Sequence, residues 1–411
     1  MALTFTVKPH KDEPVDNATL LGAGKMVSTL ADFLASKDLI SPLVIAVNGE
    51  WGSGKTSLIT TVKKEIEKKG TVTAIFNAWQ YEYSEPAGAM VYQIVSQTGP
   101  NKEIRRKAKE MAGLALDIFA RKTAGIDLPA IKQHFEGSVS AVTTLSNRLE
   151  KYLQEDVQAE RMVVFIDDLD RCSLENVIQL LEAVKLFLTV PKAVFVLAVD
   201  ISKVKLAWSL KYGRVEQSID EGPVHGKADR LTEEGLKYLE KIIQIQLELP
   251  KPSNEQLKEY LKSLDPGYTD DFCNLIAALN LTNPRSIKRF LNLVSFRANI
   301  PETGGMKTEA ALVWTAMEHA AGEEAAAKMY NAYGDPSMFL QAINELGGFS
   351  ESSWENQLKS SSKLSLFSNV SLGKLSLRDF WHFSKAVRPF SGKGGDIYTA
   401  LGQIVAFSRR A

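Results

Sequence analysis

Short apolar runs alternate with longer segments of helical spacing along the first 250 residues of the chain. Each run is rich in Val, Ile, Leu and Phe and is bounded by polar or turn-forming residues, which is typical of buried strands. The runs predicted as strands are Leu43–Val47, Thr71–Phe76, Met162–Ile166, Ala193–Val199 and Ile243–Leu249. Because helical segments separate these runs, the pattern predicts an α/β fold with a parallel sheet and helices on both faces.

The segments between the runs carry apolar residues at helical spacing. Helices are predicted over Lys25–Ser36 and Leu174–Leu188. The interval from Pro86 to Glu160 is predicted to be a mostly helical insertion. The stretch from Gly213 to Asp229 is polar and contains three glycines and a proline. We therefore predict a mobile loop there.

The remainder of the chain also has a helical pattern. Asn283 can cap a helix whose first residue is Pro284. The apolar residues of this helix that are predicted to face inward are Ile287, Phe290, Leu291 and Val294. The basic residues that this spacing leaves outward are Arg285, Lys288 and Arg289.

A glycine-rich motif follows the first predicted strand and precedes a predicted helix. It matches the pattern G-x-x-x-x-G-K-[ST] in full, and this strand-to-helix context favours a phosphate-binding loop over an incidental glycine-rich turn. Its residues, with the one that follows, are Gly49, Glu50, Trp51, Gly52, Ser53, Gly54, Lys55, Thr56 and Ser57. The sequence therefore predicts nucleotide binding.

The residue types of this motif fit the chemistry of a triphosphate. Glycines let the backbone curl so that several N–H groups point at phosphate oxygens, and the helix that follows adds the positive end of its dipole. Lys55 places a charge on the β- and γ-phosphates, and Thr56 offers a hydroxyl to Mg²⁺.

A second acidic motif follows the third predicted strand. Asp167 comes at the end of this strand and is the candidate metal-holding carboxylate, while Asp168 is the candidate to polarise the attacking water. The alternative is a polar turn in which Asp170 or Ser173 caps the next helix. The two motifs together favour the catalytic interpretation, because each predicts the chemistry of the other.

These motifs and three further blocks resemble the KAP-family P-loop NTPases, a branch of the STAND and AAA+-like group. The resemblance spans roughly residues 16 to 295. The blocks that carry it are 49–57, Phe76-Asn77-Ala78-Trp79, Asp167-Asp168-Leu169-Asp170-Arg171-Cys172, 238–244 and 283–292.

The resemblance implies a five-stranded core sheet in the order 5-1-4-3-2, with ATP and Mg²⁺ as ligands. We expect a P-loop NTPase domain over residues 1–250, with a helical insertion at about 86–160. A helical lid over 251–300 and a helical C-terminal region over 301–411 are expected to follow. Many relatives carry transmembrane helices in the insertion. Here its most apolar part, Met111–Ala120, is too short to span a bilayer, so the resemblance is to a form without them.

Several further residues are candidates for sensing or transferring charge at the γ-phosphate. Similarity to AAA-like proteins implies that Arg285 reaches back to this phosphate from the lid. Asp200 and Asn77 are candidates to orient the attacking water, although each also has an ordinary structural interpretation. Trp79 and Tyr81 are expected to pack beneath the insertion. Candidates for an arginine finger or its equivalent are Arg171, Arg230 and Lys241.

Composition agrees with a globular intracellular protein. The chain has 411 residues, of which 45% are hydrophobic, and 49 basic residues balance 49 acidic residues. A formal charge of zero argues against a surface that coats nucleic acid. Two cysteines cannot build a disulfide framework, and the N-terminus lacks a secretory pattern, so the cytoplasm is expected.

Two functions remain open from the sequence. In the first, the chain is an ATPase that acts as a regulatory or assembly switch. We expect it to have no effector of its own and to work as a homo-oligomer or with separate effector proteins. Resemblance to the KAP family implies a role in bacterial defence against phage. In the second, it is a slow or non-hydrolysing, nucleotide-dependent scaffold. A weaker hypothesis is DNA binding through a local basic patch, whose residues would be Arg285, Lys288, Arg289 and Arg297.

Overall fold

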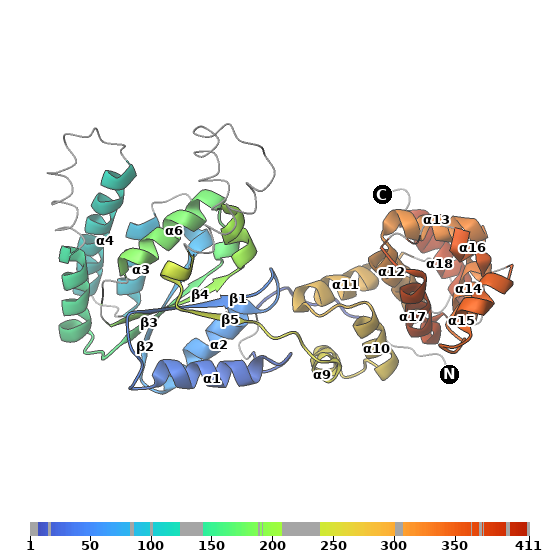
Figure 1. Cartoon of the computed structure of the whole chain (residues 1–411), viewed down its shortest axis with the longest axis horizontal. Helices are drawn as coiled ribbons and strands as arrows, with labels where there is room; N and C mark the ends of the chain where they lie inside the picture. Colours follow the sequence, from blue (N-terminus) through green and yellow to red (C-terminus); the bar gives the residue numbers. More distant parts are fainter. Residues whose placement is uncertain are drawn as a thin grey trace. The chain divides into compact units, whose positions relative to one another are not determined.

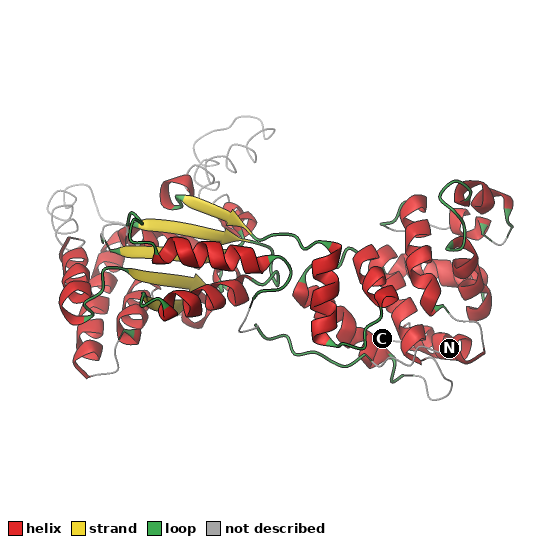
Figure 2. Cartoon of the chain, turned by 90° about the horizontal axis from the view of Figure 1, so that it is seen from below, coloured by secondary structure: helices red, strands yellow, loops and turns green. Residues whose placement is uncertain are grey.

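The computed structural model divides the chain into two compact units. One comprises Pro14–Thr19 and Ala23–Pro250, and the other comprises Met1–Glu13, Leu20–Gly22 and Lys251–Ala411. Figures 1 and 2 show their elements. The residues that the structure describes are 7–14, 18–82, 86–98, 102–123, 143–187, 190, 192–207, 239–300, 307–362, 364–369, 372, 374–391 and 395–408.

The unit that contains Ala23–Pro250 is built on a five-stranded parallel sheet. Its strands are β1 (Leu43–Asn48), β2 (Val72–Asn77), β3 (Met162–Asp167), β4 (Ala193–Val199) and β5 (Ile245–Glu248). They lie in the order β2-β3-β4-β1-β5, and all four neighbouring pairs are parallel. This confirms the predicted α/β fold and its strand order.

Helices cover both faces of this sheet, as Figure 1 shows. Ile45 and Val47 of β1 belong to the core cluster that contains α1 (Ala23–Ala35) and α2 (Lys55–Lys68). Val44 and Ala46 belong to the cluster on the other face. The helices of that cluster are α3 (Pro86–Gln97), α4 (Lys102–Thr123) and α6 (Leu174–Phe187). The alternation along β1 explains why a strand between two helical layers is apolar at every interior position.

The predicted insertion between β2 and β3 is mostly helical where the structure describes it. Helices α3 and α4 pack against each other, residues 143–151 are helical, and a turn of π-helix follows at Tyr152–Asp156. Within the described residues, no helix is both long and apolar enough to cross a bilayer.

The edge strand β5 begins two residues later than the apolar run that predicted it. Residues 239–242 are helical, and the N–H of Ile243 donates to the carbonyl of Leu239, which ends this helix. The strand pairs with β1 from Ile245 onward. The loop predicted at 213–229 lies outside the described residues.

The second unit is helical, as Figure 2 shows, and shares a single hydrophobic core. Residues predicted as lid and as C-terminal region contribute to this same core. Its helices are α9 (Asn254–Leu264), α10 (Asp270–Ala278), α11 (Pro284–Arg297), α12 (Lys307–Ala321), α13 (Glu323–Tyr333), α14 (Pro336–Leu346), α15 (Trp354–Ser360), α16 (Ser365–Asn369), α17 (Leu377–Val387) and α18 (Gly395–Ser408). The predicted helical character of this region is confirmed.

Helix α11 begins as the sequence predicts. The side chain of Asn283 accepts hydrogen bonds from the N–H groups of Arg285 and Ser286, and Pro284 occupies the first turn. A capped, proline-initiated start fixes the register of the helix and so the face that each basic residue occupies.

The prediction that Lys288 faces solvent is wrong. This residue is only 9% exposed, and its ammonium donates to the carbonyl of Glu13 at 3.4 Å. The cause is the N-terminal segment, which lies along α11: the N–H of His10 donates to Oδ1 of Asn292, and Nδ2 of Asn292 donates to the carbonyl of His10. A single asparagine thus pairs with both main-chain groups of one residue.

Candidate functional site

The loop between β1 and α2 adopts a tight, curled conformation. Gly52 and Gly54 have φ values of 83° and 103°, in the region that favours glycine. The N–H of Gly49 donates to the carbonyl of Val199 at 3.2 Å, which ties the loop to the end of β4. A Cβ atom added at Gly49 would lie 2.7 Å from Oγ of Ser53 and 2.9 Å from Cδ1 of Leu249, so a larger residue would displace these side chains.

The loop fits a phosphate group. The N-cap of α2 is Gly54, which offers no side chain to the first N–H groups of the helix. A Cβ atom added at Gly54 would meet nothing within 4 Å, so space lies open beside this main chain. The hydroxyl of Ser53 is buried and has no hydrogen-bond partner. A phosphate oxygen would satisfy these donors.

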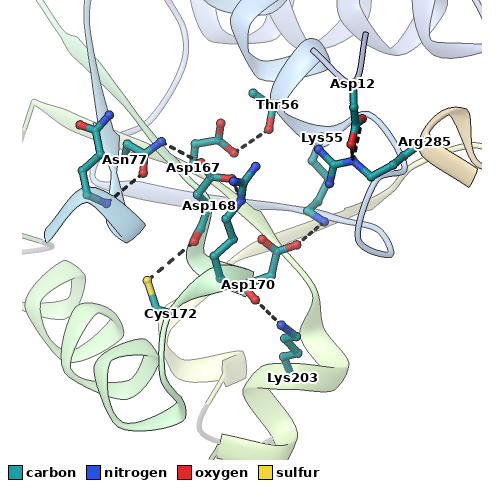
Figure 3. Close-up of polar contacts among 12 residues, drawn as sticks. Asp12, Lys55, Thr56, Asn77, Asp167, Asp168, Asp170, Cys172, Lys203 and Arg285 are labelled. Atoms are coloured by element: carbon teal, nitrogen blue, oxygen red, sulfur yellow. Dashed lines mark hydrogen bonds and ion pairs between the residues drawn. The ribbon is translucent and has the colours of Figure 1, made fainter. Parts of the chain in front are cut away.

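Lys55 is buried and makes three hydrogen bonds. Its ammonium donates to the carbonyls of Gly49 and Glu50 at 2.8 Å and 3.1 Å. It also donates to Oδ2 of Asp170 at 2.8 Å, and Figure 3 shows this third contact. The side chains of Lys55 and Asp170 are 7% and 5% exposed. The sequence predicts phosphate contact for Lys55 and does not predict this ion pair.

The two predicted metal-holding residues lie next to each other. The hydroxyl of Thr56 donates to Oδ1 of Asp167 at 3.1 Å. Burial, followed by the negative charge of Asp168, raises the pKa of Asp167 to about 6. A hydroxyl beside a carboxylate is an all-oxygen donor set, which suits Mg²⁺. These residues therefore fit the ion that the fold implies.

The carboxylate of Asp168 is held on both of its oxygens. Nδ2 of Asn77 donates to Oδ2 at 2.8 Å, and Nε of Arg171 lies 2.7 Å from Oδ1. The register of the sheet places Asn77 beside Asp167, so the ends of β2 and β3 bring the amide and the acids together. Asp168 itself has a φ of 56°, which turns the chain sharply after β3.

The domain that contains this site matches a known protein family. The model of the KAP family P-loop domain matches residues 24–300, which is more than half of the chain. The chain belongs to the KAP family of P-loop NTPases. The loop at 49–56 and the acids after β3 lie within the matched residues of this KAP domain.

One relative of known name is the phage T7 exclusion protein of Escherichia coli (strain K12). The two are 21% identical over 336 residues, which cover 70% of this chain and 42% of the relative. The KAP protein described here thus matches less than half the length of that relative.

Two solved structures resemble the chain at low sequence identity. The Aeropyrum pernix ORC2 protein (ADPNP–ADP complexes) has a TM-score of 0.37 and 14% identity, covering 99% of this chain and 97% of that one. Cdc6p from Pyrobaculum aerophilum has a TM-score of 0.41 and 11% identity, covering 97% of both chains. Such low scores do not establish a shared arrangement of the whole chain.

The turn after β3 in the KAP domain uses its polar residues for two purposes. Asp170 contacts Lys55, and it is Ser173 that caps α6, accepting from the N–H of Asn176 at 3.4 Å. The carbonyl of Asp170 accepts a hydrogen bond from the ammonium of Lys203. Asp170 therefore contacts Lys55 through its carboxylate and Lys203 through its main-chain carbonyl.

The aromatic residues after β2 differ in their environment. Tyr81 stacks on Phe76 with a centroid distance of 5.2 Å and is half-buried, as expected. The expectation for Trp79 is wrong, since its side chain is 52% exposed. The guanidinium of Arg171 lies over its ring, 5.4 Å from the centroid, which accounts for an indole at the surface.

Three of the remaining candidates make ordinary structural contacts. Oδ1 of Asp200 accepts from the N–H of Ser202 at 3.0 Å, so this residue caps the turn after β4. Nε of Arg285 pairs with Asp12 at 2.8 Å within the helical unit. Arg171 contacts an acid of its own chain, and Arg230 lies outside the described residues.

Asp170 as part of the site, and the contact of Arg171 with Asp168, are not predicted from the sequence. The available signal is the spacing Asp-Asp-x-Asp-Arg after a buried strand, which brings a third acid and a cation into the same turn. Spacing alone does not tell which acid contacts which lysine.

Proposed function

We propose that this KAP protein binds ATP with Mg²⁺ and hydrolyses the γ-phosphate, using the cycle as a regulatory or assembly switch. The observation that supports this most is the 3.1 Å contact between Thr56 and Asp167, because it brings the phosphate loop and the first acid after β3 to one place. This is the arrangement on which phosphoryl transfer depends in P-loop NTPases.

Each residue has a role in this proposal. Lys55 and the loop main chain bind the phosphates, Thr56 and Asp167 hold Mg²⁺, and Asp168 accepts the proton of the attacking water. Mg²⁺ supplies neutralisation of charge on the β- and γ-oxygens. Arg285 is proposed to contact the γ-phosphate from the lid over 251–300.

We further propose a role in defence against phage, carried out in the cytoplasm. The support is the similarity to a phage T7 exclusion protein, of which the chain matches 42%. Both cysteines are free thiols, which agrees with a reducing compartment. The partners that we propose are further copies of the chain or a separate effector protein.

A slower switch is the second candidate. Its support is the carboxylate of Asp168, which Asn77 and Arg171 occupy on both oxygens. A base held in this way must first loosen one bond to act freely on water. The protein would then bind nucleotide and bind a partner through its helical unit, and hydrolysis would begin only after a further signal.

DNA binding through the basic patch finds little support. Lys288 and Arg297 are each 9% exposed, and Arg285 is paired with Asp12. Arg289 is the member that the structure shows exposed. The patch as predicted does not form a continuous charged surface on α11.

The test of the proposed activity is multiple-turnover hydrolysis of ATP in the presence of Mg²⁺. Asp168→Asn should lower kcat by roughly 10²- to 10⁴-fold while ATP binding persists, since an amide cannot accept a proton. Asp38→Asn, an exposed acid before β1, is the control. Turnover at the wild-type rate in Asp168→Asn would show that another group activates water.

A further inference from the structure

The ammonium of Lys55 has no donor left for a phosphate. An ammonium carries three N–H donors. Here three acceptors lie within 3.1 Å, namely the carbonyls of Gly49 and Glu50 and Oδ2 of Asp170. A nucleotide can gain a bond from Lys55 only if one of these acceptors leaves or shares its donor.

Asp170 is the acceptor that must give way. The two carbonyls belong to the phosphate loop itself, so they stay close to Lys55 whenever the loop keeps its curled form. Asp170 comes from the turn Leu169–Arg171 after β3 and brings a full negative charge. The carboxylate of Asp170 and a phosphate are both anions, so they repel each other beside Lys55 more strongly than a main-chain carbonyl repels a phosphate.

We propose that Asp170 is an internal competitor of the nucleotide for Lys55. Its carboxylate occupies the place of a phosphate oxygen and is displaced when a β- or γ-phosphate binds. Asp170 thereby sets the affinity of the site and favours ligands with enough charge to displace it. This inference rests on the proposed function, since it assumes that Lys55 binds nucleotide phosphates.

Lys203 gives the displaced carboxylate a partner. Its ammonium already donates to the carbonyl of Asp170, and it lies in the helical residues 201–207 that follow β4. A buried carboxylate that loses its cation is costly, whereas one that changes cation is not. The exchange of Asp170 from Lys55 to Lys203 therefore keeps the buried charge paired in both states.

The alternative is a fixed pair in which Asp170 orients Lys55 for the nucleotide. The two ideas make opposite predictions. If Asp170 orients the lysine, removal of its charge weakens nucleotide binding. If it competes, removal strengthens binding of every ligand that uses Lys55 and leaves the others unchanged.

The test is calorimetric binding of ATP, ADP and AMP to Asp170→Asn and wild type. We expect about 10-fold tighter binding of ATP and ADP, the size of one hydrogen bond to a charged group. AMP lacks the β- and γ-phosphates that Lys55 is proposed to bind, so its affinity should be unaffected. Asp38→Asn serves as the control for a lost surface charge.

The same substitution in a Lys55→Ala background separates competition from general repulsion. Long-range repulsion between Asp170 and the phosphates would persist without Lys55, whereas competition for the ammonium would vanish. We therefore expect Asp170→Asn to have no effect on ATP affinity in this background. An unchanged or weaker affinity in the single variant, or an equal gain in both backgrounds, overturns the inference.

Two further results keep the outcome clear. If Lys55→Ala alone leaves ATP affinity unchanged, the proposed nucleotide site fails, and not only the competitor. If Asp170→Asn does not fold, the variant Lys203→Met tests the exchange instead. It should weaken the binding of ATP and ADP several-fold and leave the binding of AMP unchanged, because the released carboxylate loses its second cation. Unchanged ATP affinity in Lys203→Met would contradict the exchange.

Discussion

The side-chain amide of Asn77 donates a hydrogen bond to Oδ2 of Asp168 at 2.8 Å. Asn77 is the last residue of β2 and Asp168 directly follows β3, and the parallel register of the two strands brings them together. The acid proposed to activate water is therefore restrained by the strand beside it, and hydrolysis should respond to changes in either residue.

Removal of this restraint should speed hydrolysis. We expect Asn77→Ala to raise kcat for ATP by about 5-fold with little change in KM, the equivalent of about 1 kcal/mol from one hydrogen bond. Steady-state kinetics measure this. The double variant Asn77→Ala/Asp168→Asn should be as slow as Asp168→Asn alone, and a fall in kcat for Asn77→Ala would show that the amide positions the acid productively.

Asp167 should make the nucleotide-free protein less stable as pH rises. Burial and Asp168 raise its pKa to about 6, whereas an Asp carboxyl in an unfolded chain titrates near 4. Between about pH 4 and 6 the folded state binds the extra proton, so the contribution of Asp167 to the free energy of unfolding falls across this window, by up to about 3 kcal/mol.

The variant Asp167→Asn has no proton to lose and should flatten this dependence. Denaturant titrations of both proteins between pH 4.5 and 7 measure the difference. Parallel curves for wild type and Asp167→Asn would show that the carboxyl titrates at an ordinary pH in the folded state.

Arg285 should matter for hydrolysis more than its neighbour on the same helix. If it contacts the γ-phosphate in the transition state, Arg285→Ala should lower kcat by roughly 10²-fold. Arg289→Ala is the matched control, since Arg289 lies one turn further along α11 and is exposed. Equal effects of the two substitutions on kcat would contradict a catalytic role for Arg285 and leave it only the ion pair with Asp12.

Arg297 should contribute to the stability of the folded protein and not to DNA binding. Its guanidinium lies 2.6 Å from Glu318, and both side chains are about nine-tenths buried. Arg297→Met leaves Glu318 as an unpaired buried charge, so we expect a loss of about 3–5 kcal/mol in the free energy of unfolding.

Adding Glu318→Gln to Arg297→Met should restore part of that loss, which urea denaturation would show. Salt-dependent binding of DNA that disappears in Arg297→Met at a temperature where the protein remains folded would contradict this structural role.

The sheet could be predicted because buried parallel strands are continuous apolar runs. β4 has the bounds that its sequence predicts, Ala193–Val199, and all seven residues are buried. β5 is less well predicted because it lies at the edge and alternates in exposure, so its apolar run does not mark where pairing begins.

The positions of Asp167 and Asp168, the acids with proposed roles in hydrolysis, could be predicted because they stand at the end of β3, where the sheet fixes position. The pairing of Asp170 with Lys55 could not, because it depends on a turn with a positive φ at Asp168. The burial of Lys288 could not be predicted either, since its partner Glu13 is 275 residues away in the sequence. Contacts between distant segments leave no periodic pattern.

Equilibrium binding of ATP and Mg²⁺ to Lys55→Ala tests the proposed nucleotide site most directly. Loss of the charged donor should weaken ATP binding by roughly 10- to 100-fold relative to wild type. Lys68→Ala, at the exposed end of the same helix, should bind like wild type. Equal affinity of Lys55→Ala and wild type for ATP would contradict the claim that this loop is the nucleotide site.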